Sequence, residues 1–175
     1  MKHKACFHTP RQCLLMMVMF TTTSIMLSAT FVCATNNSAS LAVSWSSSDH
    51  SALLEFKASL DAHLNLMTWS GDDHCSGLWY GVRCDANGRV NRLVLQGLQL
   101  SGGPIEPLAR LDALRILSLD NNLLNGSLPT NFSNWRYMRS LYLSRNEFSG
   151  PIPDSISTLS RLWRLDLSHN ILSGH

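Results

Sequence analysis

Residues 111–126 of this 175-residue chain read LDALRILSLDNNLLNG, and the leucines, the asparagine and the final glycine of this stretch recur at a spacing of 24 residues. The central L-x-L pair occurs four times, as Leu93/Leu95, Leu117/Leu119, Leu141/Leu143 and Leu165/Leu167. A short strand of this kind points both leucines to one side, because successive side chains alternate in direction. The spacing therefore predicts a solenoid in which stacked strands form a parallel sheet.

Polar and glycine positions follow the leucine pairs. Three pairs are followed by Asn122, Asn146 or Asn170. An asparagine amide carries donors and an acceptor, so a buried copy is expected to satisfy backbone groups in the turn after the strand. The first repeat has Leu98 where asparagine would stand. We attribute this departure to a neighbouring cap, because terminal repeats are atypical.

Two of the repeats end in Gly126-Ser127-Leu128-Pro129 and Gly150-Pro151-Ile152-Pro153. With these tails the pattern resembles the plant-type leucine-rich repeat. The resemblance implies an α/β solenoid, a right-handed superhelix with short parallel strands on its concave face. Residues 90–175 would hold four repeats, the last truncated, because the sequence reaches Gly174 and His175 before the final tail. We expect the apolar side chains of that last coil to have an exposed edge.

Residues 49–89 have a different pattern, which predicts a cap. Asp49 is a candidate helix N-cap. Apolar residues follow at helical spacing on one face, namely Leu53, Phe56, Leu60 and Leu64. The order A-L-L-x-F-K, W, C and W-x-G-V-x-C between Ala52 and Cys84 resembles the N-terminal cap of plant leucine-rich repeats. Such a helical, disulfide-bonded cap would cover the hydrophobic end of the solenoid.

The first 34 residues have the composition of a secretory signal peptide. Lys2, Lys4 and Arg11 precede an apolar run, and Val32 and Ala34 suit a cleavage site near Ala34. A polar patch at residues 21–24 argues against the alternative of an uncleaved membrane anchor. Cleavage would lower the number of Lys and Arg residues from 14 to 11, against 12 Asp and Glu residues, and so change the net charge from +2 to −1. A chain with this charge has no basic patch that would indicate a nucleic-acid partner. Residues 35–48 are serine-rich and are expected to form a flexible arm.

Cysteine positions indicate one disulfide. Cys6, Cys13 and Cys33 lie in the predicted leader, which leaves Cys75 and Cys84. In a secreted chain this pair is expected to form a disulfide that contributes about 2 to 3 kcal/mol. The alternative is a zinc site that adds His74, but structural zinc normally has four ligands. We therefore predict neither a metal nor a cofactor.

Three N-x-[ST] sequons predict N-glycosylation at Asn36, Asn125 and Asn131. The last two fall in the loop and return side of one repeat, away from the strand face. Glycans there would leave the concave face free for a partner.

Outward positions between the strand leucines form columns across the repeats, and these columns are the predicted partner-binding face. The face comprises Arg92, Val94, Gln96, Ile116, Ser118, Asp120, Tyr142, Ser144, Arg145, Arg164, Asp166 and His169. Arginine and tyrosine are frequent interface anchors. The alternative is a solvated sheet face with scattered aromatic residues.

Catalysis has little support in the sequence. Asp166, Ser168 and His169 supply an acid, a hydroxyl and an imidazole, but residues so close along a strand do not normally converge as a triad. Nucleophile-elbow, phosphate-loop and kinase motifs do not occur. We predict that this chain is not an enzyme.

The phrases SGLWYGVRC at residues 76–84 and LSRLWRLDLSHN at residues 159–170 resemble the N-terminal part of the ectodomain of plant leucine-rich repeat receptor-like kinases. The resemblance implies extracellular recognition of a peptide or protein ligand, with a co-receptor ectodomain as a further partner. The chain would be secreted or held at the outer face of the plasma membrane, by a C-terminal segment that this sequence does not include. The alternative is a self-contained secreted binding protein, such as a defence inhibitor of cell-wall hydrolases.

Overall fold

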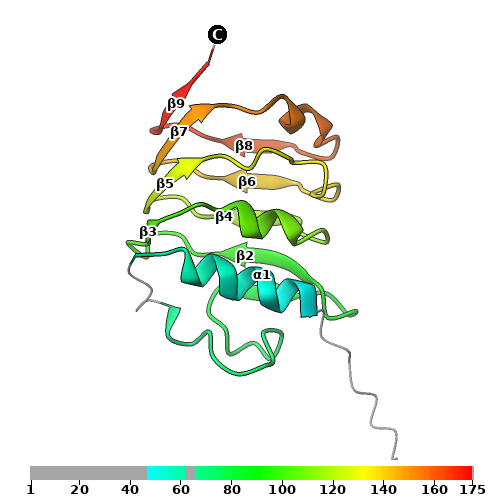
Figure 1. Cartoon of the computed structure of the whole chain (residues 1–175). Helices are drawn as coiled ribbons and strands as arrows, with labels where there is room; N and C mark the ends of the chain where they lie inside the picture. Colours follow the sequence, from blue (N-terminus) through cyan, green and yellow to red (C-terminus); the bar gives the residue numbers. More distant parts are fainter. Residues whose placement is uncertain (1–46, 62–65, 175) are drawn as a thin grey trace, which may run out of the picture. The chain divides into compact units, whose positions relative to one another are not determined.

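The computed structural model describes residues 47–61 and 66–174, all within the compact unit Ala39–His175 (Figure 1). The predicted signal peptide, most of the serine-rich arm and the sequon at Asn36 lie outside these residues. Within the described ranges, no helix has the length and apolar character needed to cross a membrane.

Two sheets run along the stacked coils (Figure 1). The main sheet has the order β1 (Val82–Cys84), β2 (Val90–Val94), β4 (Ile116–Ser118), β6 (Ser140–Tyr142) and β8 (Arg164–Asp166). The second sheet has the order β3 (Ser101–Gly102), β5 (Leu123–Ser127), β7 (Glu147–Pro151) and β9 (Ile171–Ser173). Strands β2, β4, β6 and β8 are parallel neighbours, and their register pairs Leu93, Leu117, Leu141 and Leu165 in succession. This arrangement confirms the predicted leucine-rich repeat solenoid.

The returning side of the coils carries two short 3-10 helices, η2 (Glu106–Arg110) and η3 (Asp154–Thr158). Leu108 in η2 and Phe132 in the next coil are buried, and Ile156 in η3 is half-buried. Together with the strand leucines they fill the interior of each coil. The core is thus one continuous column of apolar layers.

Asn122 lies behind β4 and connects two coils. Its carboxamide oxygen accepts hydrogen bonds from the backbone N–H groups of Leu98 and Leu100, each at 3.0 Å. Its amide group donates to the carbonyl oxygens of Leu95 at 2.9 Å and Leu119 at 2.8 Å. The side chain is buried, so these bonds satisfy polar groups that water does not reach.

The same bonds recur one coil at a time. Asn146 donates to the carbonyl oxygens of Leu119 and Leu143, at 3.0 and 3.1 Å. Asn170 donates to those of Leu143 and Leu167, at 2.9 and 3.0 Å. We call Asn122, Asn146 and Asn170, with these bonds, the asparagine ladder. It confirms the predicted role of the asparagines in the turns.

The cap helix α1 (Ser47–Ala58) differs from the predicted helix at both ends. It begins before Asp49, which therefore lies in the first turn, and the last residues of the predicted arm are helical. The buried Asp49 carboxylate accepts the backbone N–H of Val90 at 2.8 Å, so it joins the cap to β2. It also bonds to the guanidinium of Arg89.

The sequence predicted a helix that continues through Leu60 and Leu64, but α1 ends at Ala58. Leu60 is buried, but it forms a bridge with Gly102, and the backbone N–H of Asp61 donates to the carbonyl of Ser101 at 2.9 Å. Pairing with β3 thus replaces the next helical turn. Leu64 lies outside the described residues.

Two stacked tryptophans form the centre of the cap. The rings of Trp69 and Trp79 are 5.4 Å apart and inclined by 16°, and both side chains are buried. Their indole N–H groups donate to backbone carbonyls, from Trp69 to Tyr80 at 2.9 Å and from Trp79 to Ser70 at 3.0 Å. Large apolar rings with satisfied N–H groups are suited to covering the end of the solenoid.

The last coil is much less covered. Leu165 is 47% exposed and Ile171 is 67% exposed, whereas Leu117 and Leu141, in the same column as Leu165, are fully buried. Leu162, Leu167 and Leu172 are half-buried. The apolar edge predicted for this coil is therefore present in the structure.

Candidate binding face

The main sheet aligns the predicted columns as the 24-residue spacing requires. Its parallel register places Arg92, Ile116, Ser140 and Arg164 in one column. The next column contains Val94, Ser118, Tyr142 and Asp166. Residues far apart in sequence therefore form adjacent rows on the concave side.

A hollow of about 370 Å³ lies across strands β2, β4 and β6 and the residues that follow them. It is lined by Arg92, Val94, Gln96, Ile116, Ser118, Asp120 and Tyr142. All seven belong to the predicted face. The other five residues of the predicted face do not line this hollow: Ser144 and Arg145 follow β6, and Arg164, Asp166 and His169 lie in the next coil.

Three serines in these columns are buried, which corrects the expectation that column residues are exposed. Ser118 lies between Val94 and Tyr142 of the neighbouring strands, and Ser140 lies between Ile116 and Arg164, whereas Ser144 follows β6. The Ser118 hydroxyl donates to the Asp120 carboxylate. Ser118 and Ser144 therefore form the floor of the face and support its acids, rather than reaching towards a partner.

Arg145 and His169 also lie differently from a simple strand position. Together with Gly97 and Asn121 they occupy the turn after each strand, with φ between 54° and 68°. This left-handed conformation costs a residue other than glycine about 1 kcal/mol or more. The backbone N–H of Arg145 donates to the Ser168 carbonyl at 3.0 Å, which fixes the turn. Both side chains are exposed at the rim of the face.

Asp166, Ser168 and His169 form a turn rather than a catalytic triad. The Ser168 hydroxyl donates to Oδ1 of Asp166 at 2.7 Å, and the Ser168 backbone N–H donates to the same atom at 3.0 Å. These bonds, with that from the Ser144 hydroxyl and the charge of His169, lower the pKa of Asp166. The serine proton is thus directed at the carboxylate and not at an imidazole. Asp166 supplies a fixed negative charge at this end of the face.

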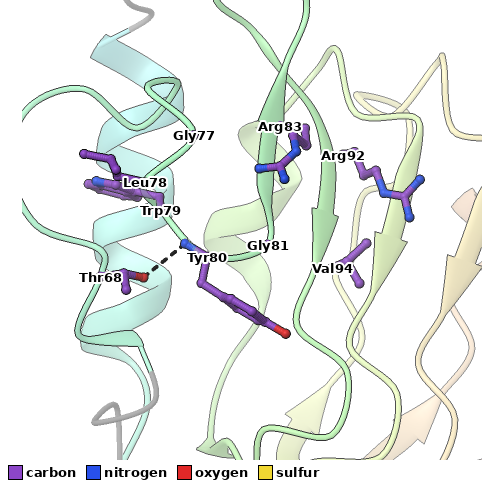
Figure 2. Close-up of a pocket in the computed structure, with 9 residues that line it drawn as sticks. All are labelled: Thr68, Gly77, Leu78, Trp79, Tyr80, Gly81, Arg83, Arg92 and Val94. Carbon is purple, nitrogen blue, oxygen red and sulfur yellow. Dashed lines mark hydrogen bonds between the residues drawn. The ribbon is translucent and has the colours of Figure 1, made fainter.

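A second hollow, of about 560 Å³, was not predicted from the sequence. It lies between the cap and the first strands and is lined by Thr68, Gly77, Leu78, Trp79, Tyr80, Gly81, Arg83, Arg92 and Val94 (Figure 2). Figure 2 shows Arg83 and Arg92 on neighbouring strands, with Tyr80 held by a 3.0 Å bond from its backbone N–H to the Thr68 hydroxyl. Tyr80 is 53% exposed. Because Arg92 and Val94 line both hollows, the candidate face extends onto the cap.

The cap cysteines are joined as predicted, in a disulfide between Cys75 and Cys84. Donor atoms of His74 and the two cysteines lie within 4.8 Å of one another, but the disulfide leaves no thiolate for the alternative zinc site. His74 is fully buried beside the rings of His50 and Trp79. Burial is the main reason that the pKa of His74 is lowered.

The two described sequons lie away from the main sheet. Asn125 is on β5, in the second sheet, and Asn131 is in the loop that follows. Both residues are exposed. Their glycosylation remains a prediction, and their position keeps the concave face clear.

Comparison with known proteins identifies both parts of the fold. Residues 44–85 match the leucine rich repeat N-terminal domain, and residues 112–172 match the leucine rich repeat. An inactive leucine-rich repeat receptor-like serine/threonine-protein kinase of Arabidopsis thaliana is 46% identical over 97 residues, which cover 55% of this chain and 14% of that protein. The chain spans between 13% and 15% of the length of three curated relatives that it matches.

Solved structures give the same result. The PEPR1-AtPEP1 crystal structure has a TM-score of 0.65 and 32% identity, covering 73% of this chain and 18% of that one. The ectodomain of the receptor kinase SOBIR1 from Arabidopsis thaliana has a TM-score of 0.60 and 32% identity, covering 73% and 70% of the two chains. The chain therefore belongs to the leucine-rich repeat family, and its cap and repeats are those of a plant receptor-like kinase ectodomain.

Proposed function

We propose that this chain is the extracellular ligand-recognition part of a plant receptor kinase and that its concave face binds a peptide or protein ligand. The observation that carries the proposal is the 370 Å³ hollow, because seven residues from successive coils converge on it. The hollow combines a cation, Arg92, an anion, Asp120, and an aromatic ring, Tyr142, with apolar Val94 and Ile116. Such a mixture suits a polypeptide, which offers all of these groups.

The spacing of the strands suggests how a ligand would lie. Neighbouring strands are about 4.8 Å apart. An extended peptide crossing β2, β4 and β6 would therefore meet a new column residue on each strand. In this arrangement Arg92 would pair with a ligand carboxylate, Asp120 would accept from a ligand N–H group, and Tyr142 would provide the apolar anchor.

The proposal puts the face outside the cell, with residues 1–34 directing secretion and the disulfide adapted to an oxidising environment. In the whole receptor, a membrane helix and a kinase or kinase-like domain would transmit the binding event. A co-receptor ectodomain would be a second partner. The names of the relatives support this view for proteins that are much longer than this chain.

Selection of a phage-displayed library of random 12-residue peptides on the secreted protein tests the proposal. Peptides that bind wild type should bind the Tyr142→Ala and Arg92→Ala variants about tenfold more weakly, equivalent to about 1.4 kcal/mol. Leu123→Ala is the matched control, since Leu123 is an exposed apolar residue on β5. Failure to select any peptide, or equal binding by all variants, would overturn the concave face as the ligand site.

A further inference from the structure

The turns that lead into β4, β6 and β8 carry a concentration of arginine and aromatic residues that the concave face does not include. We call this surface the arginine edge, and it consists of Arg115, Arg136, Tyr137, Arg139, Arg161 and Trp163. The backbone N–H of Arg139 donates to the carbonyl of Arg115 at 2.8 Å, and that of Trp163 donates to the carbonyl of Arg139 at 3.1 Å. These residues therefore occupy equivalent positions on consecutive coils, about 4.8 Å apart.

Within the described residues, the arginines of this edge form no ion pair. All four arginines are exposed, and Trp163 is 68% exposed. In the part of the chain that the structure describes, ion pairs within 4.0 Å involve only Arg89 and Arg110 among the arginines. Like charges held this close repel each other, so an anionic partner would be attracted.

Two arginines here are stacked on aromatic rings. The guanidinium of Arg161 lies 5.1 Å from the ring centre of Tyr137, and that of Arg164, from the concave face, lies 4.3 Å from the ring centre of Trp163. A stacked guanidinium keeps the N–H donors in its plane available while its motion is restricted. Such a planar fork matches a carboxylate bidentately.

At its cap end, the arginine edge borders a hollow that could hold an acidic group. A hollow of about 450 Å³ is lined there by Asp85, Asn87, Arg89, Asp112, Ala113, Arg115, Arg136 and Tyr137. Its two carboxylates already have donors: Asp112 pairs with Arg89, and Asp85 accepts the backbone N–H groups of Asn87 and Arg89. The cations of the edge are therefore available to an incoming acidic group.

We propose that the arginine edge binds an acidic polypeptide segment, as a second interaction surface beside the concave face. Arginine, tyrosine and tryptophan are the residues most enriched among the energetic anchors of protein interfaces. The Asp and Glu side chains of such a segment would pair with the guanidinium forks. The inference goes beyond the proposed ligand site, because no residue of the edge belongs to that site.

Binding of fluorescein-labelled decaglutamate to the secreted protein, measured by anisotropy at low salt, tests the proposal. Arg139→Gln should weaken binding about fivefold, and the triple variant Arg115→Gln/Arg139→Gln/Arg161→Gln more than about 20-fold. Arg110→Gln is the control, since it removes another exposed arginine, on η2 and outside the edge, and should leave binding within about 1.5-fold. Arg139→Lys should give an intermediate value, because lysine keeps the charge but loses the fork.

Several results would overturn the arginine edge as a binding surface. Equal weakening by Arg139→Gln and Arg110→Gln would show that net charge alone attracts the probe. The edge would also be excluded if decaglutamine bound as well as decaglutamate, or if neither bound. Tighter binding of a galacturonate decamer than of decaglutamate through these arginines would overturn the assignment to a polypeptide. Each variant is first checked by circular dichroism, so that a loss of fold is not mistaken for a loss of affinity.

Discussion

The two ends of the solenoid follow the same 24-residue pattern but are buried to very different degrees. At the cap end, Trp69 and Trp79 are 1% exposed, and Leu93 is fully buried. At the other end, Leu165 has the same place in its strand as Leu93 but is about half exposed. The repeat therefore sets the position of an apolar residue, whereas the neighbouring coil or cap determines how much that residue stabilises the fold.

Replacing one tryptophan from each end should give the greatest contrast. Trp79→Ala opens a cavity in the cap and is expected to lower the free energy of unfolding by about 3 to 5 kcal/mol. Trp163→Ala removes an exposed ring and should change it by less than about 0.5 kcal/mol. Urea denaturation followed by far-UV circular dichroism measures both. Similar losses for the two variants would contradict the difference between the ends.

Replacing leucines at equivalent positions of two strands tests the same difference in burial within the repeats. Leu117→Ala should cost about 3 kcal/mol, because Leu117 is fully buried between two coils. Leu165→Ala should cost about 1 kcal/mol, because half of its surface already meets water. Amide hydrogen exchange gives an independent measurement, with faster exchange expected in β8 than in β2. Strong and equal protection of both strands would show that the last coil is not frayed.

Two glycines of the cap separate backbone strain from steric overlap. Gly81 and Gly71 have similar positive φ values, 76° and 79°. A Cβ at Gly81 would overlap the carbonyl oxygen of Val94, whereas a Cβ at Gly71 would meet no atom within 4 Å. We therefore expect Gly81→Ala to cost about 2 kcal/mol or more and Gly71→Ala about 1 kcal/mol, measured by thermal denaturation. Equal losses of stability for the two variants would mean that the backbone where the cap meets β2 can move to accommodate the added methyl group.

The stability of the fold should also depend on pH through the cap, and this effect should be smaller than the stability losses expected for the buried residues above. Burial, with a smaller contribution from His50, lowers the pKa of His74 in the folded chain, and Asp49 and Asp73 oppose this shift. The unfolded state therefore binds more protons below about pH 6.5, and stability should decrease as the pH falls from there towards the folded pKa. His74→Phe should reduce this dependence between about pH 7.5 and 5.5, as measured by urea denaturation. An unchanged pH dependence would exclude His74 as its source.

Much of the fold could be predicted because its determinants repeat. Leu117 and Asn122 have counterparts one coil away, so a single spacing predicts the sheet, the core and the asparagine ladder. The end of α1 could not be predicted, because it depends on the pairing of Leu60 with Gly102, a contact between distant parts of the chain. Local helical spacing contains no information about that contact.

The candidate site was predicted in outline but not in detail. Strand alternation was expected to place Arg92 and Tyr142 on one face, and both line the same hollow. It does not reveal that Ser118 is covered by its neighbours, nor that Arg145 has a left-handed backbone. The hollow beside Tyr80 also depends on how the cap loops fold against β2, and that packing has no repeat to indicate it.

The asparagine ladder also limits how a chain of this kind can change length. Asn122, Asn146 and Asn170 each bond to a carbonyl oxygen 27 residues earlier, across the boundary between two coils. A one-residue insertion in the turn between the second strand leucine and the asparagine would displace the amide from these carbonyls, whereas duplication of a 24-residue unit would restore every bond. Genes for such proteins can therefore gain or lose whole coils more readily than parts of one. The binding face can be extended by adding rows without redesigning the rows already present.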